Sequence, residues 1–281
     1  MKRIKKTSFI KLALVAVVGL LNFAIRSTVI AESANAGKID QTKQAAVDSS
    51  TGVDEQALAI LKKATSYLTG LTKFRVKAIA AIDVVQDSGQ KLQFGSTAEV
   101  TVKRPNRIYA SRTLEEGDVR RFWYDGAVAT LYEESANVYT KIPVFDTIDE
   151  TLDYLETVIK DPRPLADLLY NDLSPLLKVP LSGSYVGESY LGVTACDHLA
   201  FRGKSLDWQF WVERGEKPLI RKVVITYKEL PGEPQFVAHL VEWDTQPELS
   251  DALFQFSPPE GARQIRFVTL RKNDSEKGGA Q

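Results

Sequence analysis

Apolar and polar side chains alternate with a period of two along most of this chain, and this alternation limits its fold more than any other feature. It begins where Phe74 and Val76 alternate with Arg75 and Lys77, a pattern typical of a strand with one buried face. Tight-turn signals separate the runs, and one of them, Asp125-Gly126, is typical of β-hairpins. The runs expected to form strands are 74–84, 91–104, 107–114, 119–124, 127–132, 138–142, 184–190, 193–202, 207–213, 219–228 and 236–245, with a short last one at 254–256.

Two segments carry a helical period instead. Residues 51–68 have apolar side chains at helical spacing, and Thr51 or Asp54 can cap the start. A helical insert follows at 147–175; it opens with a capping box and includes a second predicted helix at 165–170. Short strands joined by tight turns, with few helices, predict a mainly β (α+β) fold: a curled antiparallel sheet of about eleven strands whose concave face the helices cover.

The first 36 residues have the three parts of a secretory signal peptide. A basic segment, Lys2–Lys6, precedes a mostly apolar stretch, and Ala34-Asn35-Ala36 supplies the pattern that a signal peptidase cleaves. An uncleaved membrane anchor is the alternative, but the uninterrupted apolar run, Leu12–Leu21, is about 10 residues long against the roughly 20 that span a bilayer. We therefore expect a periplasmic protein whose mature chain has no membrane span.

The expected organisation is a signal peptide (1–36), a flexible polar spacer (37–53), a single domain (54–268) and a disordered tail (269–281). Basic and acidic residues number 36 each, but six basic residues and one acid lie in the first 36 positions. The rest of the chain holds 30 basic and 35 acidic residues. A weakly acidic body argues against nucleic acid as a partner.

The candidates for catalysis are few. Cys196 and His198 share one face of a predicted strand, about 7 Å apart, and could form a thiolate nucleophile or half of a metal site. The alternative is a buried thiol beside a histidine held by ordinary packing, and we favour it because the chain has a single Cys. A metal site that adds His239 is also disfavoured, and no G-x-S-x-G or P-loop motif is present. We expect no enzyme, no cofactor and no metal.

The four tryptophans all fall on predicted strands, and one strand carries a tryptophan on each face. Trp208 and Phe210 share one face of that strand, whereas Trp211 lies on the other. Ordinary core packing explains any single ring. Taken together with leucines of the helical insert, the rings are candidates to line a cavity for an apolar ligand such as an acyl chain. The candidate ligand-binding residues are Trp123, Leu152, Leu155, Leu168, Leu169, Trp208, Phe210, Trp211 and Trp243.

Several local strings resemble a known bacterial family. They include FWYDG at 122–126, TIDETLDYL at 147–155, CDHLAFR at 196–202 and DWQFWVERGEKPL at 207–219. Together they are similar to domain-of-unknown-function family 2092, predicted periplasmic proteins, over roughly residues 54–268. The resemblance implies the fold of the LolA/LolB-like lipoprotein-carrier superfamily, a half-open β-barrel with a helical lid that typically holds acyl chains. It implies no reaction and no catalytic residues.

Three hypotheses follow. The first is a non-catalytic periplasmic carrier or chaperone that binds a lipid or a lipoprotein acyl chain in the half-barrel. The second is a module that binds an envelope protein or acts as a sensor, with an interior filled by side chains. The third, which we disfavour, is a hydrolase or metal enzyme that uses His198 or His239.

Overall fold

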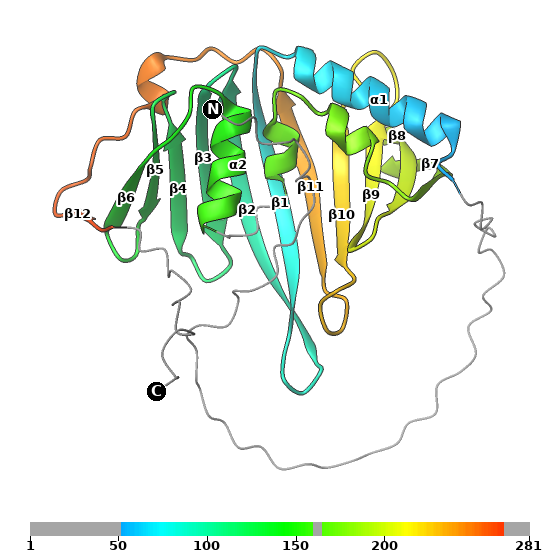
Figure 1. The fold of residues 1–281 in the computed structure, drawn as a ribbon, viewed down its shortest axis with the longest axis horizontal. Helices are drawn as coiled ribbons and strands as arrows, with labels where there is room; N and C mark the ends of the chain where they lie inside the picture. The colour runs from blue at the N-terminus through cyan, green and yellow to red at the C-terminus, as the bar shows by residue number, and fades with distance from the viewer. Residues whose placement is uncertain (1–51, 160–164, 267–281) are drawn as a thin grey trace, which may run out of the picture.

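The computed structural model describes residues 52–159 and 165–266. In these ranges, twelve strands form one sheet in the order β12-β6-β5-β4-β3-β2-β1-β11-β10-β9-β8-β7 (Figure 1). The strands are β1 (Lys73–Val85), β2 (Lys91–Lys103), β3 (Arg107–Leu114), β4 (Val119–Tyr124), β5 (Val128–Glu133), β6 (Val138–Pro143), β7 (Ser182–Leu191), β8 (Thr194–Arg202), β9 (Leu206–Glu213), β10 (Ile220–Tyr227), β11 (Gln235–Asp244) and β12 (Arg263–Gln264).

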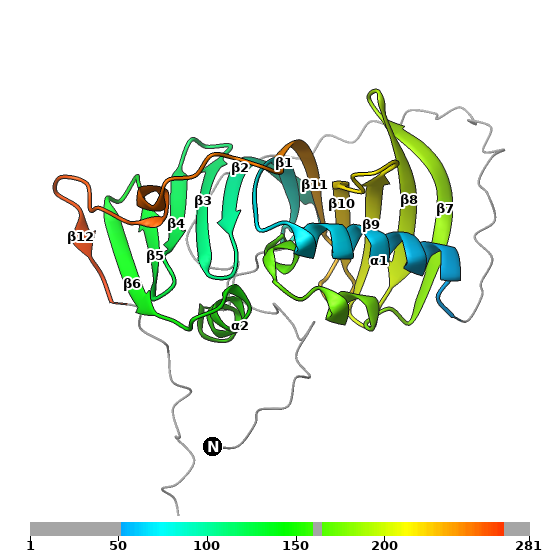
Figure 2. The same cartoon turned by 90° about the horizontal axis from the view of Figure 1, so that it is seen from above.

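Two antiparallel meanders make up the sheet. Strands β1 to β6 follow one another, as do β7 to β11, and the two groups join where β1 pairs with β11. The short β12 pairs in parallel with β6. The sheet curls around the helices (Figure 2), but its edge strands β7 and β12 do not pair with each other. The described sheet is therefore half-open.

The two faces of the sheet differ as the alternation predicts. We call the face that the helices cover the inner face and the opposite one the outer face. On β1, Phe74, Val76 and Ala78 are buried on the inner face, while Arg75 and Lys77 project from the outer face with neighbouring polar side chains. Burial of this apolar face supplies most of the driving force for folding such a sheet.

The helix α1 (Glu55–Gly70) crosses the inner face of β7, β8 and β9 (Figure 2). The side chain of Asp54 caps its start by accepting the N–H of Gln56 at 2.7 Å. Ala57, Leu61 and Ala64 recur at helical spacing and are at most 1% exposed, so this stripe of the helix faces the core.

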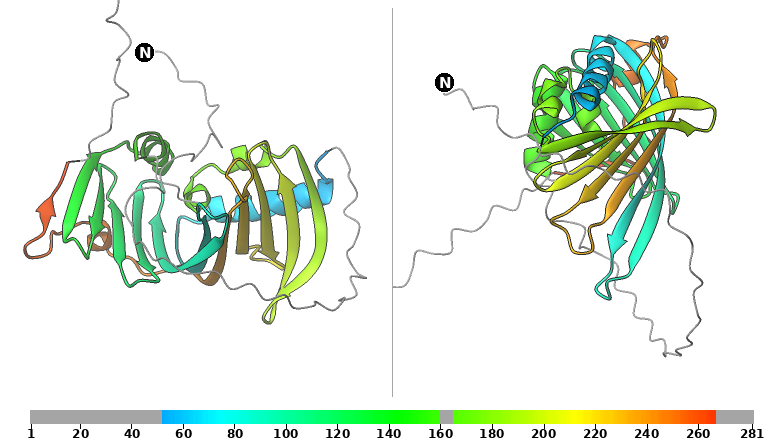
Figure 3. Two further views of the ribbon diagram at one scale, coloured as in Figure 1. Left: turned by 90° about the horizontal axis from the view of Figure 1, so that it is seen from below. Right: turned by 90° about the vertical axis from the view of Figure 1, so that its right-hand side faces the viewer.

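The second helix, α2 (Ile148–Ile159), lies over the first meander (Figure 3). Its Leu155 packs on Ala129 and Ile142. The predicted cap is confirmed, because Thr147 Oγ1 accepts the N–H of Glu150 at 3.2 Å. Three 3-10 turns complete the list of elements: η1 (Ala166–Leu169), η2 (Ser174–Leu177) and η3 (Asp251–Phe254). None of the described helices is long and apolar enough to cross a membrane.

The strands β1 to β11 confirm the eleven longer predicted runs, with bounds that differ by a few residues. The predicted short strand at 254–256 is wrong, because this segment leaves η3 and crosses the outer face instead of joining the sheet. Pro258 and Pro259 follow it, and proline cannot donate to a ladder. The predicted helix at 165–170 is a four-residue 3-10 turn. The predicted first helix begins later than expected, because residues 52–54 are not helical and Val53 forms a β-bridge with Gly183. The signal peptide and the tail lie outside the described residues.

A β-bulge corrects one predicted grouping on β11. Strict alternation puts His239, Val241 and Trp243 on one face, but the register with β1 shifts between them. Trp243 lies opposite Val76 and joins the inner face, whereas His239 lies opposite Ile79 on the outer face. The extra residue that a bulge adds to one strand reverses the alternation beyond it.

Candidate functional site

The segment between β6 and β7 covers part of the inner face, and we call its helix α2 together with residues 165–177 the lid (Figures 2 and 3). Its apolar side chains point at the sheet, since Leu152, Leu155 and Leu168 are each at most 6% exposed. They belong to core clusters that include strand residues of the sheet. The lid is therefore held on the sheet mainly by apolar contact.

Arg104, in the turn after β2, fixes one end of the lid. Its Nη1 donates to the carbonyl of Leu169 and to Oδ1 of Asn171, each at 2.8 Å. Its Nε donates at 3.2 Å to the carbonyl of Leu71, the residue that follows α1. The guanidinium also lies 5.7 Å from the centroid of the Phe74 ring. Burial lowers the pKa of Arg104, but an arginine stays charged at any physiological pH.

Asp149, in the first turn of α2, completes this anchor. Its carboxylate accepts the backbone N–H of Asn171 at 2.6 Å and that of Asp172 at 3.2 Å. The Asn171 side chain donates in turn to the carbonyl of Pro105 at 3.1 Å, and Ile148 N–H donates to the same carbonyl at 3.0 Å. Hydrogen bonds to charged groups are the stronger ones, so this end of the lid is firmly attached.

The end of the lid around Leu165 rests on apolar contacts. Leu165 packs with Ile82 and Tyr227 against the buried side chains of Phe236 and Ala238. Such contacts are non-directional and can be exchanged for contacts of similar area. The two ends of the lid are thus held by different kinds of interaction.

The inner face continues past the lid onto the free end of the β1–β2 hairpin (Figure 1). In the described sheet, β1 pairs with β11 only as far as Ile82, and β2 pairs with β3 only from Ser96. The last paired residue of β1, Ile82, lies opposite Phe94, and beyond it Val84 lies opposite Leu92, all on the inner face. Phe94 and Leu92 are each 37% exposed. We call Ile82, Val84, Leu92 and Phe94 the mouth strip.

Acidic side chains lie on the lid near this mouth. Burial, and next the carboxylate of Glu156, raise the pKa of Asp167 to about 7. Solvent reaches the Asp167 side chain, so the group is recessed among protein atoms but open to water. Burial, with a contribution from Asp167, also raises the pKa of Tyr227 to about 12. The lid therefore gains negative charge beside the mouth as the pH rises toward neutrality.

Seven of the nine predicted ligand-binding residues lie on the inner side of the molecule. Leu152, Leu155, Leu168, Trp208 and Phe210 are buried, and Leu169 and Trp243 pack against the same core. The other two, Trp123 and Trp211, lie on the outer face, where Trp123 packs against Tyr109 and Trp211 against His198. The predicted set is thus divided between the two faces.

The mouth strip was missed by the sequence reasoning. The sequence does contain the pattern that could have identified it, because the period-two alternation continues through Ile82, Val84, Leu92 and Phe94. Only the register shows that the end of the hairpin, from Val84 to Phe94, has no neighbouring strand.

Cys196 and His198 are held by packing and by a hydrogen bond. Cys196 is buried, and burial with the nearby Glu213 carboxylate raises its pKa to about 11. His198 stacks on Trp211 with ring centroids 4.0 Å apart, and its Nε2 lies 2.9 Å from Oε1 of Gln209. In the part of the chain that the structure describes, no three His, Cys, Asp or Glu side chains are grouped to hold a metal ion.

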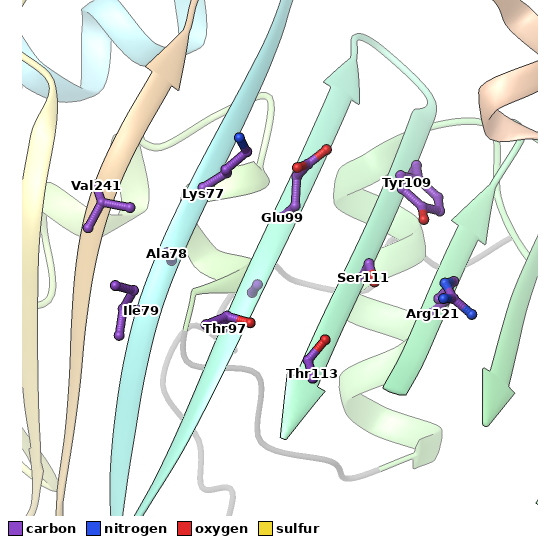
Figure 4. Close-up of a pocket in the computed structure, with 11 residues that line it drawn as sticks. Lys77, Ala78, Ile79, Thr97, Glu99, Tyr109, Ser111, Thr113, Arg121 and Val241 are labelled. Atoms are coloured by element: carbon purple, nitrogen blue, oxygen red, sulfur yellow. The ribbon is translucent and has the colours of Figure 1, made fainter. Parts of the chain in front are cut away.

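Two hollows lie on the outer face and share Tyr109 and Arg121. The first, of about 430 Å³, crosses five neighbouring strands from β11 to β4 (Figure 4). The second, of about 400 Å³, lies between the sheet and residues 252–259. We call the two hollows together the outer groove and residues 250–264 the strap.

Comparison with known proteins gives one family. The family described as "Predicted periplasmic protein (DUF2092)" matches residues 57–268. No curated protein matches the chain.

Solved structures with a similar fold exist. The Mycobacterium tuberculosis lipoprotein LppX is 13% identical with a TM-score of 0.45, covering 70% of this chain and 100% of that chain. LprF from Mycobacterium bovis is 12% identical with a TM-score of 0.45, covering 75% and 99%. A LolA superfamily protein from Nitrosomonas europaea is 10% identical with a TM-score of 0.36, covering 71% and 97%. Similarity this low supports no transfer of function.

The family match extends over most of the chain and over the whole described sheet, from within α1 to beyond β12. The family's description places its members in the periplasm, in agreement with the expected export. The chain therefore belongs to DUF2092, a family of predicted periplasmic proteins.

Proposed function

We propose that this protein is a non-catalytic periplasmic carrier that binds an apolar ligand, a lipid or a lipoprotein acyl chain, on the inner face of its half-open sheet. The ligand enters at the mouth strip and displaces the apolar end of the lid. The polar anchor at Arg104 and Asp149 keeps the lid attached meanwhile.

The mouth strip is the observation that carries this proposal. Its side chains extend the apolar inner face beyond the lid, and Leu92 and Phe94 remain 37% exposed. Exposed large apolar side chains that continue a core are typical of interaction sites. Each acyl CH₂ that moves from water onto such a surface contributes about 0.8 kcal/mol. Burial of an acyl chain of several carbons therefore offsets the loss of the Leu165 contacts.

The chemistry of the Cys196 region supports a role without catalysis. A thiol whose pKa is raised to about 11 is nearly all protonated near pH 7, whereas nucleophilic cysteines have lowered pKa values. The His198 ring stacks on Trp211, and its Nε2 is hydrogen-bonded to Gln209. Neither group is prepared for nucleophilic attack.

The test begins with native mass spectrometry of the protein purified from a periplasmic extract without detergent, followed by lipid extraction. We expect a stoichiometric adduct of lipid mass. Binding of a fluorescent long-chain fatty acid is then compared between the double variant Leu92→Ser/Phe94→Ser and the control Ile79→Ser/Val241→Ser. The control residues are 55% and 53% exposed but lie on the outer face.

The mouth variant should weaken fatty-acid binding at least about tenfold, and the control should leave it unchanged. An apo mass with no uptake of fatty acid by the wild-type protein would overturn the proposal. Equal weakening in both variants would also count against it, since it would place binding away from the mouth.

A module that binds an envelope protein is the second candidate, and the filled inner face favours it. Beneath the helices Phe74, Leu199 and Phe210 are at most 4% exposed, and both described hollows lie on the outer face. Such a module should purify from the envelope as a stable complex with a protein and without lipid.

A further inference from the structure

The outer face carries a row of aromatic rings, and the strap buries one of them, Tyr132, which is 6% exposed. Trp123 lies 5.5 Å from Tyr109 and 4.9 Å from Phe256, measured between ring centroids. Phe256, on the strap, also lies 4.9 Å from Tyr139 and 6.0 Å from Tyr132. A sheet face opposite the core is usually polar. Phe256 covers part of this row, but Tyr109 and Trp123 are only half-buried and line the outer groove, where they can contact another molecule.

The floor of the groove beside these rings is small and rich in hydroxyl groups. Thr97 and Thr113 lie opposite each other on β2 and β3, and Ser111 lies between Glu99 and Arg121 in the next cross-strand row (Figure 4). The short Ser111 side chain leaves space between its longer neighbours. Hydroxyl groups both donate and accept hydrogen bonds.

The charged side chains along the groove are neutralised within the protein. The ion pairs are Lys77 with Glu242 at 2.9 Å, Arg75 with Glu99 at 3.5 Å, and Arg121 with Glu134. The groove therefore offers hydrogen-bonding groups without an excess of either charge. Such a surface favours a neutral polar ligand over an anionic or cationic one.

The backbone under the groove is fully occupied by the sheet. β2 pairs with both β1 and β3, and β3 pairs with β4, through continuous registers. Addition of a peptide strand needs an exposed sheet edge, and the groove lies on a face. A ligand bound here must bring flat apolar surfaces for the rings and its own hydroxyl groups for the floor.

We propose that the outer groove binds a neutral oligosaccharide. The flat faces of its sugar rings lie on Tyr109 and Trp123. Its hydroxyl groups bond to Thr97 and Ser111, and to the charged groups of Glu99 and Arg121, which keep their own ion-pair partners. The two hollows, of about 430 and 400 Å³, share two residues and so form one continuous, open groove. This site lies on the face opposite the mouth strip, so it is independent of acyl-chain binding.

The test is titration of the protein with a tetramer of β-1,4-linked N-acetylglucosamine and, in parallel, with cellotetraose, by calorimetry and tryptophan fluorescence. We expect saturable binding of at least one sugar. Ser111→Phe should fill the floor and weaken binding at least about tenfold. The matched control is Ser184→Phe on β7, also on the outer face but away from the groove.

Fluorescence then locates the site. The sugar-induced change should be lost in Trp123→Phe and kept in Trp211→Phe, which removes the other outer-face tryptophan. Thermal melting checks that each variant folds. The proposal is overturned if neither sugar binds the wild-type protein at millimolar concentration, or if Ser111→Phe binds as well as the wild type. An unstructured peptide that binds in the groove while the sugars do not would equally refute it.

Discussion

Arg104 connects three segments of the chain through one guanidinium group, since it bonds to Leu71 after α1 and to Leu169 and Asn171 of the lid. Arg104→Met keeps the length of the side chain but removes these bonds and leaves their acceptors unpaired. We expect the free energy of unfolding, measured by urea denaturation, to fall by about 2–4 kcal/mol. Arg120→Met breaks the exposed pair with Glu133 and should cost less than about 1 kcal/mol. Equal losses in the two variants would show that Arg104 is no anchor.

Asp167 makes stability depend on pH. Its pKa is about 7 in the folded protein against 3.8 for an ordinary aspartate, so the folded state holds the proton more tightly. This contribution is fully present below about pH 4 and is lost as the pH rises through about 7. Asp167→Asn cannot ionise, so its melting temperature relative to wild type should rise from pH 4 to pH 8. Asp87→Asn, at an exposed turn, should show no such trend. A difference that is constant with pH would contradict the prediction for Asp167.

At the scale of elements, the start of α1 is tied to the edge of the sheet. The Asp54 carboxylate accepts the N–H of Gln56 at 2.7 Å and that of Tyr185 on β7 at 3.2 Å. Asp54→Ala removes the cap and leaves the N–H groups of Gln56 and Tyr185 without their acceptor. It should lower the free energy of unfolding by about 1–2 kcal/mol. Asp54→Asn keeps an oxygen acceptor and should cost much less in the same urea experiment. Equal costs would show that the cap does not depend on a side-chain acceptor.

Phe256 is the contact that attaches the middle of the strap to the outer face, whereas the buried Phe254 and the Lys103–Asp251 ion pair hold its start. Phe256 contacts Trp123, Tyr132 and Tyr139, and the neighbouring Gln255 is exposed. Phe256→Ala should release the strap locally and lower hydrogen-exchange protection of β12 and β6, with less effect on the core strands. Gln255→Ala should change neither. If exchange slows or stays the same in Phe256→Ala, other contacts hold the strap.

The strands were predictable because one buried face repeats every second residue and glycine-containing turns separate the runs, as Asp125-Gly126 does between β4 and β5. The 3-10 turn at Ala166–Leu169 and the bulge beside Val241 were not predictable from the sequence, because both depend on packing against distant segments. For the site, the lid leucines were predictable from their helical spacing. The outward position of Trp123 and Trp211 was not, because alternation separates two faces without saying which one becomes covered.

For the molecule as a whole, the proposed function requires the apolar end of the lid to move relative to the mouth. Ile82→Cys and Leu165→Cys place thiols on either side of this contact, where a cleavable bismaleimide can link them. The linked protein should take up fatty acid at least about tenfold more slowly, and cleavage of the linker should restore the rate. The native Cys196 is buried and should not react. Uptake that is unaffected by the link would locate entry elsewhere.

The joining of the two meanders through β1 and β11 also affects how the chain reaches its native state. Each meander is built from consecutive strands, so its contacts are local and can form early. The β1–β11 ladder instead brings Arg75 beside Asp244, from near the two ends of the described chain. Folding slows as contacts between sequence-distant residues become necessary. We therefore expect the ladder between β1 and β11 to form late, after two separately collapsed halves.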